Sequence, residues 1–234
     1  MVKILQMYNV KKCIILERIN KFVAKVVLDG KVQLSYVNNT GRLLKYLSRG
    51  HIGFCVFHEG KRKTRCRLFA IKEGSLAVLI DTGLQMKALE KAIALECIPW
   101  IKKCCILKRN VRLGASYIDY LLECSGRRVY LEVKSAVLRN GRYAMYPDCP
   151  SLRGRKHIRE LIDHARKGGL GIILFISSVP RVEVFKPNNV ADPEISRLLF
   201  EAKKVAVGIR AIEMYYDPEK SSIFLSKPDL PVDI

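Results

Sequence analysis

Long uninterrupted apolar segments are missing from this 234-residue sequence. The longest apolar run, LGIILFISSV at 170–179, contains two serines and has about the length of one strand, whereas a membrane-spanning helix needs roughly 20 apolar residues. The first twenty residues interrupt their apolar positions with Gln, Asn and Lys, unlike the continuous apolar core of a secretion signal. We therefore expect a cytoplasmic protein that does not bind membranes.

Three further signals are absent: a glycine-rich phosphate-binding loop, a CxxC pair and an internal repeat. The first absence argues against nucleotide-dependent enzymes of the P-loop and dinucleotide-binding classes. The eight cysteines are scattered, and Cys104 and Cys105 should point to opposite faces of a strand, so they are poorly placed to share a tetrahedral metal ion. We expect mostly buried cysteines, and one or two disulfides remain the open alternative.

Acidic residues are scarce, with 22 Asp and Glu against 42 Lys and Arg and a net charge of +20. Residues 1–80 alone hold 16 basic and 4 acidic residues. Such an excess favours a polyanionic partner, and we expect DNA, single- or double-stranded, with RNA not excluded. A basic surface that serves solubility alone is the alternative. The sequence leaves the oligomeric state open, a homo-oligomer included.

Short strands separated by turns fill residues 20–80, as in FVAKVVL, VQLSYV, IGFCVFH, RCRLFAI and LAVLI. About five strands with basic loops predict an OB-like β-barrel, a fold that commonly holds nucleic acid. NNTGRLLKYLSRG (38–50) predicts a turn at Gly41 followed by a short helix. Five cations fall within residues 61–67, and a phosphate backbone or plain solvent could face them: Lys61, Arg62, Lys63, Arg65 and Arg67.

The periodicity changes from two to about three and a half after Asp81, which predicts a second domain. We place the domains at 1–82 and 83–234. The second begins with a helix at LQMKALEKAIALE and continues with strands near 103–112, 116–123 and 128–138. A helix at 151–169, a buried strand at 170–179, a helix at 192–207 and terminal strands follow. This order predicts a mixed sheet covered by helices, so the overall class is α/β (α+β overall).

The stretch YIDYLLECSGRRVYLEVKS (117–135) carries charge on strands that otherwise look built for a core. Strand alternation places Glu132 and Lys134 on one face, and a turn near Ser125 and Gly126 places Asp119 beside Glu132. Two adjacent carboxylates repel unless a cation lies between them, and Mg²⁺ or Mn²⁺ prefers such oxygen ligands. We expect Asp119, Glu132 and the Val133 carbonyl to hold the metal ion.

In that arrangement Lys134 would orient a water molecule or neutralise developing phosphate charge, which is the chemistry of phosphodiester hydrolysis. A simple Glu132–Lys134 ion pair on an exposed strand is the alternative. Glu90, on the preceding helix, is a further candidate acid, although a solvated surface glutamate is the more common case. His157 is a candidate for proton transfer, with a structural role as its alternative.

The helix that starts near Ser151 gathers cations at its N-terminus, where the helix dipole already favours anions. Asp148 precedes that helix, and the expected phosphate contacts are Arg153, Arg155 and Lys156, together with Arg42, Arg62, Lys63 and Arg65 from the first domain. Ordinary helix capping with solvated cations is the alternative.

Asp119 followed by Glu132-Val133-Lys134 resembles the motif of the PD-(D/E)XK nuclease superfamily. YLEVKSAVL and YPDCPSLRGRKHIREL (146–161), with NNTGRLL (38–44), RKT (62–64) and DT (81–82), resemble the sugar fermentation stimulation protein (SfsA) family over nearly the whole chain. The resemblance implies an N-terminal OB-like domain, a PD-(D/E)XK nuclease-like C-terminal domain and DNA binding without marked sequence preference. Two functions stay open: a Mg²⁺-dependent nuclease, and a non-catalytic DNA-binding regulator of sugar metabolism genes.

Overall fold

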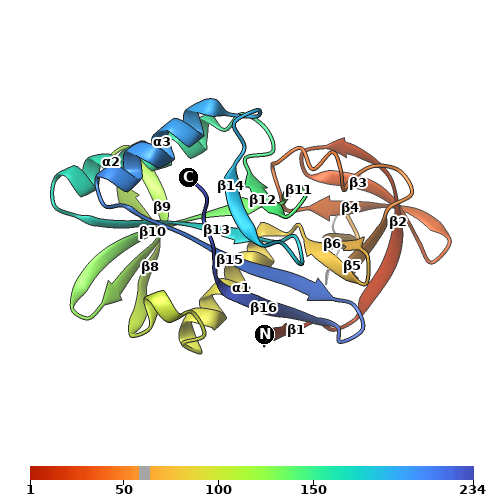
Figure 1. Cartoon of the computed structure of the whole chain (residues 1–234). Coiled ribbons are helices and arrows are strands. Elements are labelled where there is room, and N and C mark those ends of the chain that lie inside the picture. The colour runs from red at the N-terminus through yellow and green to blue at the C-terminus, as the bar shows by residue number, and fades with distance from the viewer. Residues whose placement is uncertain (58–63) are drawn as a thin grey trace.

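The computed structural model describes residues 1–57 and 64–234, which form a β-barrel joined to a helix-covered mixed sheet (Figure 1). The strands are β1 (Val2–Gln6), β2 (Val10–Asn20), β3 (Val23–Leu28), β4 (Lys31–Val37), β5 (Ile52–Phe57), β6 (Cys66–Glu73), β7 (Leu76–Leu79), β8 (Cys104–Leu113), β9 (Ser116–Cys124), β10 (Arg127–Ala136), β11 (Leu138–Asn140), β12 (Tyr143–Tyr146), β13 (Leu170–Ser177), β14 (Val184–Pro187), β15 (Gly208–Asp217) and β16 (Ser222–Leu230). The helices are α1 (Thr82–Ala94), the 3-10 helix η1 (Pro99–Ile101), α2 (Leu152–Arg166) and α3 (Pro193–Lys204). The expected α/β class is confirmed.

Five strands of the first third close into a barrel. β2 pairs with β3 and β5, β3 pairs with β4, β5 pairs with β6, and a parallel pairing of β4 with β6 closes the ring. Every second residue of β3 is buried, because alternate side chains of a strand point into the barrel. Val26, Cys55 and Leu68 fill the interior and have no exposed surface. The predicted OB-like barrel is confirmed.

Strand β1 lies outside the barrel, although it precedes the barrel in the sequence. It pairs antiparallel with β16 near the C-terminus, and the N-terminus lies beside that strand in Figure 1. Ile4 is buried there, and the pairing covers an edge of β16 that would otherwise expose unpaired backbone groups. The division at residue 82 groups this strand with the barrel, whereas in the structure it pairs with β16 near the C-terminus.

The expected short helix within residues 38–50 is absent; the segment forms turns. Leu43 adopts a left-handed φ of 51°, and the amides of Tyr46 and Leu47 both reach its carbonyl oxygen, which makes one turn only. Leu43, Tyr46 and Leu47 are all buried, and this spacing of three and four residues is also the spacing of one helix face. In the structure that burial stabilises an irregular loop against the barrel.

A mixed sheet forms the second part of the chain. β10, β13 and β15 run parallel, while β8, β9 and β10 are antiparallel neighbours. Side chains of α2 and α3 pack on one face and those of α1 on the other, so β13 is buried on both faces and reads as a continuous apolar run. No helix among the described residues has the length and apolar character that crossing a membrane requires.

The β9–β10 hairpin has the register that the sequence predicts. Ser125 and Gly126 form its turn with φ of 50° and 77°, values that suit a tight two-residue connection. Tyr120 pairs with Leu131, so Asp119 and Glu132 come next on the two strands.

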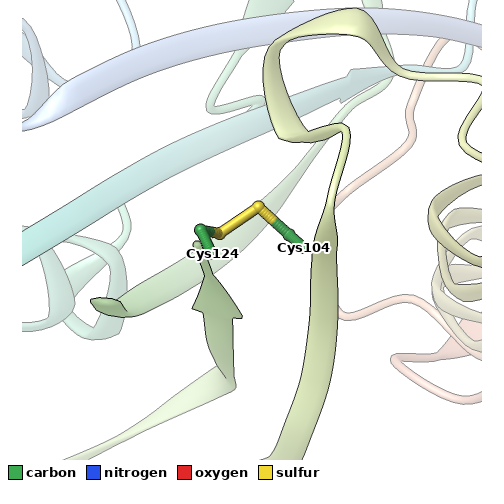
Figure 2. The surroundings of a disulfide bond; sticks show 2 residues. All are labelled: Cys104 and Cys124. Atoms are coloured by element: carbon green, nitrogen blue, oxygen red, sulfur yellow. A yellow bond between two sulfur atoms is a disulfide. The ribbon is translucent and has the colours of Figure 1, made fainter. Parts of the chain in front are cut away.

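One disulfide joins Cys104 of β8 to Cys124 of β9, which pair directly across the two strands (Figure 2). Cys105 points the other way and is exposed, as expected for strand neighbours. Cys13, Cys55 and Cys66 are free thiols buried in the barrel. The chain therefore contains both buried free cysteines and a disulfide, the two alternatives that the sequence left open.

Candidate functional site

Two carboxylates and an ammonium group meet on the face of the sheet that α2 covers. The Val133 amide donates a hydrogen bond of 2.8 Å to Asp119 Oδ2, which fixes this carboxylate beside β10. On β10 the Lys134 ammonium pairs with Glu132 Oε1. The hairpin register and strand alternation therefore bring together Asp119, Glu132 and Lys134, as the sequence predicts.

His157 of α2 completes this group. Its Nδ1 lies 2.5 Å from Glu132 Oε1, and its Nε2 lies 3.3 Å from the Nε of Arg153. Because the Arg153 guanidinium can only donate, Nε2 is the acceptor and Nδ1 carries the proton that reaches Glu132. His157 is 4% exposed, so it is a buried partner of Glu132 and not the surface residue that its helix suggested.

Burial and neighbouring charges shift the pKa of Asp119, Glu132 and Lys134 in different directions. Burial and then the nearby Glu132 charge raise the pKa of Asp119 to about 6. Burial also disfavours an ionised Glu132, but the Lys134 charge and the His157 hydrogen bond outweigh it and hold the pKa of Glu132 below its usual value. Burial disfavours charge on Lys134 too, yet the Glu132 carboxylate outweighs this and raises the pKa of Lys134. Glu132 and Lys134 are thus a buried ion pair.

One oxygen of this group lacks a partner. Glu132 Oε1 accepts hydrogen bonds from the Lys134 ammonium and from His157 Nδ1. Glu132 Oε2 is buried and has no hydrogen-bond partner among the described residues. A buried carboxylate oxygen left unpaired costs free energy, and such atoms in native proteins commonly face an ion or water. The described residues hold no group of three or more His, Cys, Asp or Glu side chains arranged as a metal site. A metal ion here would take two carboxylates, with main-chain oxygen and water as further ligands.

A cleft of about 990 Å³ opens above these residues, between the barrel and the mixed sheet. We call it the central cleft. Its floor includes Asp119, Glu132 and Lys134, and the segment from Tyr146 to Gly154 forms one wall. The barrel forms the other wall with Arg18, Lys21, Phe22, Asn38, Asn39, Thr40, Gly41, Arg42 and Leu44. The site therefore belongs to both parts of the chain.

The barrel wall is held by main-chain hydrogen bonds. The Arg18 guanidinium donates to the carbonyl oxygens of Asn39, Gly41 and Arg42 at 2.9, 2.5 and 2.6 Å. The amide of Leu43 donates to Asp148 Oδ2 at 2.9 Å, which ties this loop to the opposite wall. A Cβ atom at Gly41 would lie 2.8 Å from both Asp148 carboxylate oxygens, so glycine permits the close approach. Asp148 lines the cleft, but its carboxylate anchors a loop.

The N-terminus of α2 places one of its three expected cations in the cleft. Ser151 caps the helix by accepting from the Gly154 amide at 3.1 Å, and exposed Arg153 lines the cleft. Arg155 instead pairs with Asp192, the N-cap of α3, and Lys156 donates to the Ala115 carbonyl at 2.9 Å. Both lie outside the cleft lining, because helix phase turns them toward other elements.

The cations expected from the barrel also differ in where they lie. Arg42 is exposed and lines the cleft, and Arg65 is exposed elsewhere. Arg67 turns inward and pairs with Asp81, the N-cap of α1, so it is not available to a phosphate backbone as its basic window suggested. Arg62 and Lys63 lie outside the described residues. Arg18 and Lys21 also line the cleft, and the sequence analysis did not predict them. The turn between two expected strands could have marked Lys21 as an exposed cation, whereas no pattern marks Arg18.

Glu90 lies away from the central cleft. It accepts hydrogen bonds from Arg109 Nε at 2.7 Å and from the Tyr120 hydroxyl at 2.9 Å. Tyr120 follows Asp119 on β9, and successive strand side chains point to opposite faces. Glu90 therefore lies on the face of the sheet that α1 covers, and not beside Asp119 and Glu132.

Both parts of the chain match known protein families. Residues 16–80 match the family described as the SfsA N-terminal OB domain, and residues 83–220 match the sugar fermentation stimulation protein RE domain. The chain belongs to the sugar fermentation stimulation protein family. It is 43% identical to the family homologue of Pyrococcus furiosus over 99% of this chain and all of that protein, and 42% identical to the Archaeoglobus fulgidus homologue over the same shares.

A solved structure of Pyrococcus furiosus SfsA in complex with Ca²⁺ is similar over the full length of both chains, with a TM-score of 0.96 and 41% sequence identity. The resemblance to the sugar fermentation stimulation protein family is thus confirmed, and so is the architecture of an OB-like barrel followed by a family-specific second domain.

Proposed function

We propose that this family member is a Mg²⁺- or Mn²⁺-dependent phosphodiesterase acting on DNA. The observation that carries the proposal is the pair of carboxylates at the cleft floor, with a buried Glu132 oxygen that has no hydrogen-bond partner among residues 1–57 and 64–234. The raised pKa of Asp119 supports it, because a divalent cation would remove the repulsion between Asp119 and Glu132. The Pyrococcus furiosus relative was solved with Ca²⁺, and Ca²⁺ and Mg²⁺ both prefer oxygen ligands.

The residues that would hold the ion are Asp119, Glu132 and the Val133 carbonyl. A divalent ion bound there supplies Lewis acidity toward a phosphoryl oxygen and lowers the pKa of a bound water. Lys134 stays protonated, so it can donate to the attacking water or to a phosphate oxygen but cannot act as a base. His157 holds Glu132 in place through Nδ1. Arg42 and Arg153, on opposite walls, would bind the flanking phosphates.

Incubation of the purified chain with plasmid and linear DNA tests this function. We expect cleavage with Mg²⁺ or Mn²⁺, none with EDTA, and none for Asp119→Asn under any condition. Asp163→Asn is the matched control, because Asp163 is an exposed carboxylate on α2 outside the cleft lining. DNA that stays intact with every metal and substrate would contradict catalysis.

A second candidate function is DNA binding without cleavage, as a regulator would use it. The charge of residues 1–80, with 16 basic and 4 acidic residues, supports it. In that case Asp119→Asn would leave DNA affinity unchanged, while Arg42→Gln would weaken it and reduce the slope of log affinity against log salt by about one. An affinity that does not respond to salt would contradict both functions.

A further inference from the structure

Large apolar side chains stand on both walls of the central cleft. Phe22, in the turn between β2 and β3, is 48% exposed, and Leu44, in the following loop, is 74% exposed. Leu152, the first residue of α2, faces the cleft from the other wall and is 75% exposed. Contacts to the outside of a DNA duplex go mostly to phosphate and sugar through polar and charged groups. These three side chains therefore suit a different kind of contact.

Cations share the same walls. Lys21 adjoins Phe22, Arg42 lies near Leu44, and Arg153 follows Leu152, and all of them line the cleft. Each apolar side chain thus has a basic neighbour. Proteins that bind single strands combine a positive groove, which follows the phosphate backbone, with aromatic side chains on which the unstacked bases stack. Phe22 is the aromatic residue of this rim, and Leu44 and Leu152 add apolar contact area.

The depth of the cleft also favours a single strand over a duplex. Glu132 is 1% exposed and Lys134 is 9% exposed, whereas Leu44 and Leu152 at the rim are about three-quarters exposed. A phosphodiester must pass below the rim to reach the floor. Duplex DNA is stiff, with a persistence length of about 50 nm, and its bases are stacked inside. A single strand bends easily and can turn its bases toward an apolar rim.

We propose that the central cleft takes an unpaired nucleic-acid strand, with bases against Phe22, Leu44 and Leu152 and the phosphates directed toward Asp119 and Glu132. The inference rests on the phosphodiesterase function proposed above and names its substrate class. That class is a single strand, or the single-stranded part of a tailed or bubbled duplex. A closed duplex would contact the cationic rim without reaching the floor.

Binding of short fluorescent oligonucleotides to the full chain in EDTA tests the inference. One sequence is used as a single strand, as a blunt duplex and as a tailed duplex, each in DNA and RNA form. We expect the single strand and the tailed duplex to bind at least about tenfold more tightly than the blunt duplex, since each base contact of this kind is worth a large factor in affinity. The DNA and RNA arms show which sugar the cleft prefers.

Rim variants make the test specific. Phe22→Ala should weaken single-strand binding about fivefold to tenfold. Leu152→Ala should weaken it by a smaller factor, because leucine offers apolar contact without stacking, and both variants should change blunt-duplex binding less than about twofold. The slope of log affinity against log salt should not change, because no cation is removed. Leu95→Ala is the matched control: Leu95 is 51% exposed at the end of α1, outside the cleft lining, and we expect no change.

Equal losses on single strand and duplex, or no preference in the unaltered protein, would overturn the inference. Rim variants that alter no nucleic-acid affinity would also overturn it. Calorimetric titration of Ca²⁺ into the unaltered protein separates this from the proposed function. Strand preference without Ca²⁺ binding would leave the inference standing and contradict the metal site, and Ca²⁺ binding without strand preference would do the reverse.

Discussion

Replacing Asp119 by Asn should stabilise the metal-free protein at neutral pH while it removes metal binding. The folded protein binds a proton at Asp119 with a pKa of about 6, against 3.8 for the unperturbed group. The folded state therefore holds this proton more tightly, and the ionised carboxylate lowers stability as pH rises from about 4 to above 6. Asn stays neutral at every pH, and its side-chain oxygen can still accept from the Val133 amide.

The magnitude follows from that difference. A gap of about 2 in pKa corresponds to about 3 kcal/mol, and we expect about 1 to 3 kcal/mol because solvent reaches part of this side chain. For a chain of this length, about 2–4 °C in Tm accompanies each kcal/mol, so Asp119→Asn should melt about 2–12 °C higher at pH 7.5 in EDTA. The gain should shrink toward zero near pH 4, where Asp119 is already protonated.

Chemical and thermal unfolding of the unaltered protein, Asp119→Asn and Asp163→Asn at several pH values provide the assay. Excess Mg²⁺ should stabilise the unaltered protein and Asp163→Asn by about 2–3 kcal/mol at a hundredfold excess over Kd, and should leave Asp119→Asn unchanged. A pH-independent destabilisation by Asp119→Asn, or equal metal stabilisation of all three proteins, would refute the reasoning.

Three further predictions concern the same residues. Glu132→Gln should destabilise the protein by about 3–5 kcal/mol in denaturant unfolding, because it leaves Lys134 buried without its counter-charge; a change below about 1 kcal/mol would contradict this. Metal affinity should fall as pH drops below about 6, since a proton competes for Asp119, and a Kd that stays constant between pH 5 and 7.5 in calorimetry would exclude that competition. His157→Ala should weaken metal binding about tenfold by releasing Glu132, while His157→Asn, which can still donate to Glu132, should recover part of the loss; equal affinities for both variants would assign His157 a packing role.

Strand alternation and turn chemistry are local, which explains why the acidic group could be predicted from the sequence. Ser125 and Gly126 fix the hairpin register, and a period of two fixes the faces, so Asp119 and Glu132 had to meet. Helix phase relative to a sheet is set by tertiary packing. Sequence periodicity therefore could not show that His157 reaches Glu132 while Arg155 turns toward Asp192.

The other differences from the sequence-based expectations have one physical cause, which is that these groups contact partners outside their own segment of the sequence. Arg18 bonds main-chain carbonyl oxygens, which no residue pattern marks. Arg67 belongs to the basic segment 61–67 but forms an ion pair with Asp81. Glu90 accepts a hydrogen bond from Tyr120 on the opposite face of the sheet. β1 paired with β16, more than 200 residues away, so no local signal could assign it to the second domain.

The central claim is that Asp119 and Glu132 together hold a divalent cation at the floor of the central cleft. A crystal soaked in Mn²⁺ tests it most directly, because anomalous scattering locates the ion without reference to activity. We predict one strong peak in contact with Glu132 Oε2, which has no hydrogen-bond partner in the described part of the chain, and also in contact with Asp119. Peaks only at other carboxylates, with Glu132 still paired solely to Lys134 and His157, would contradict the account.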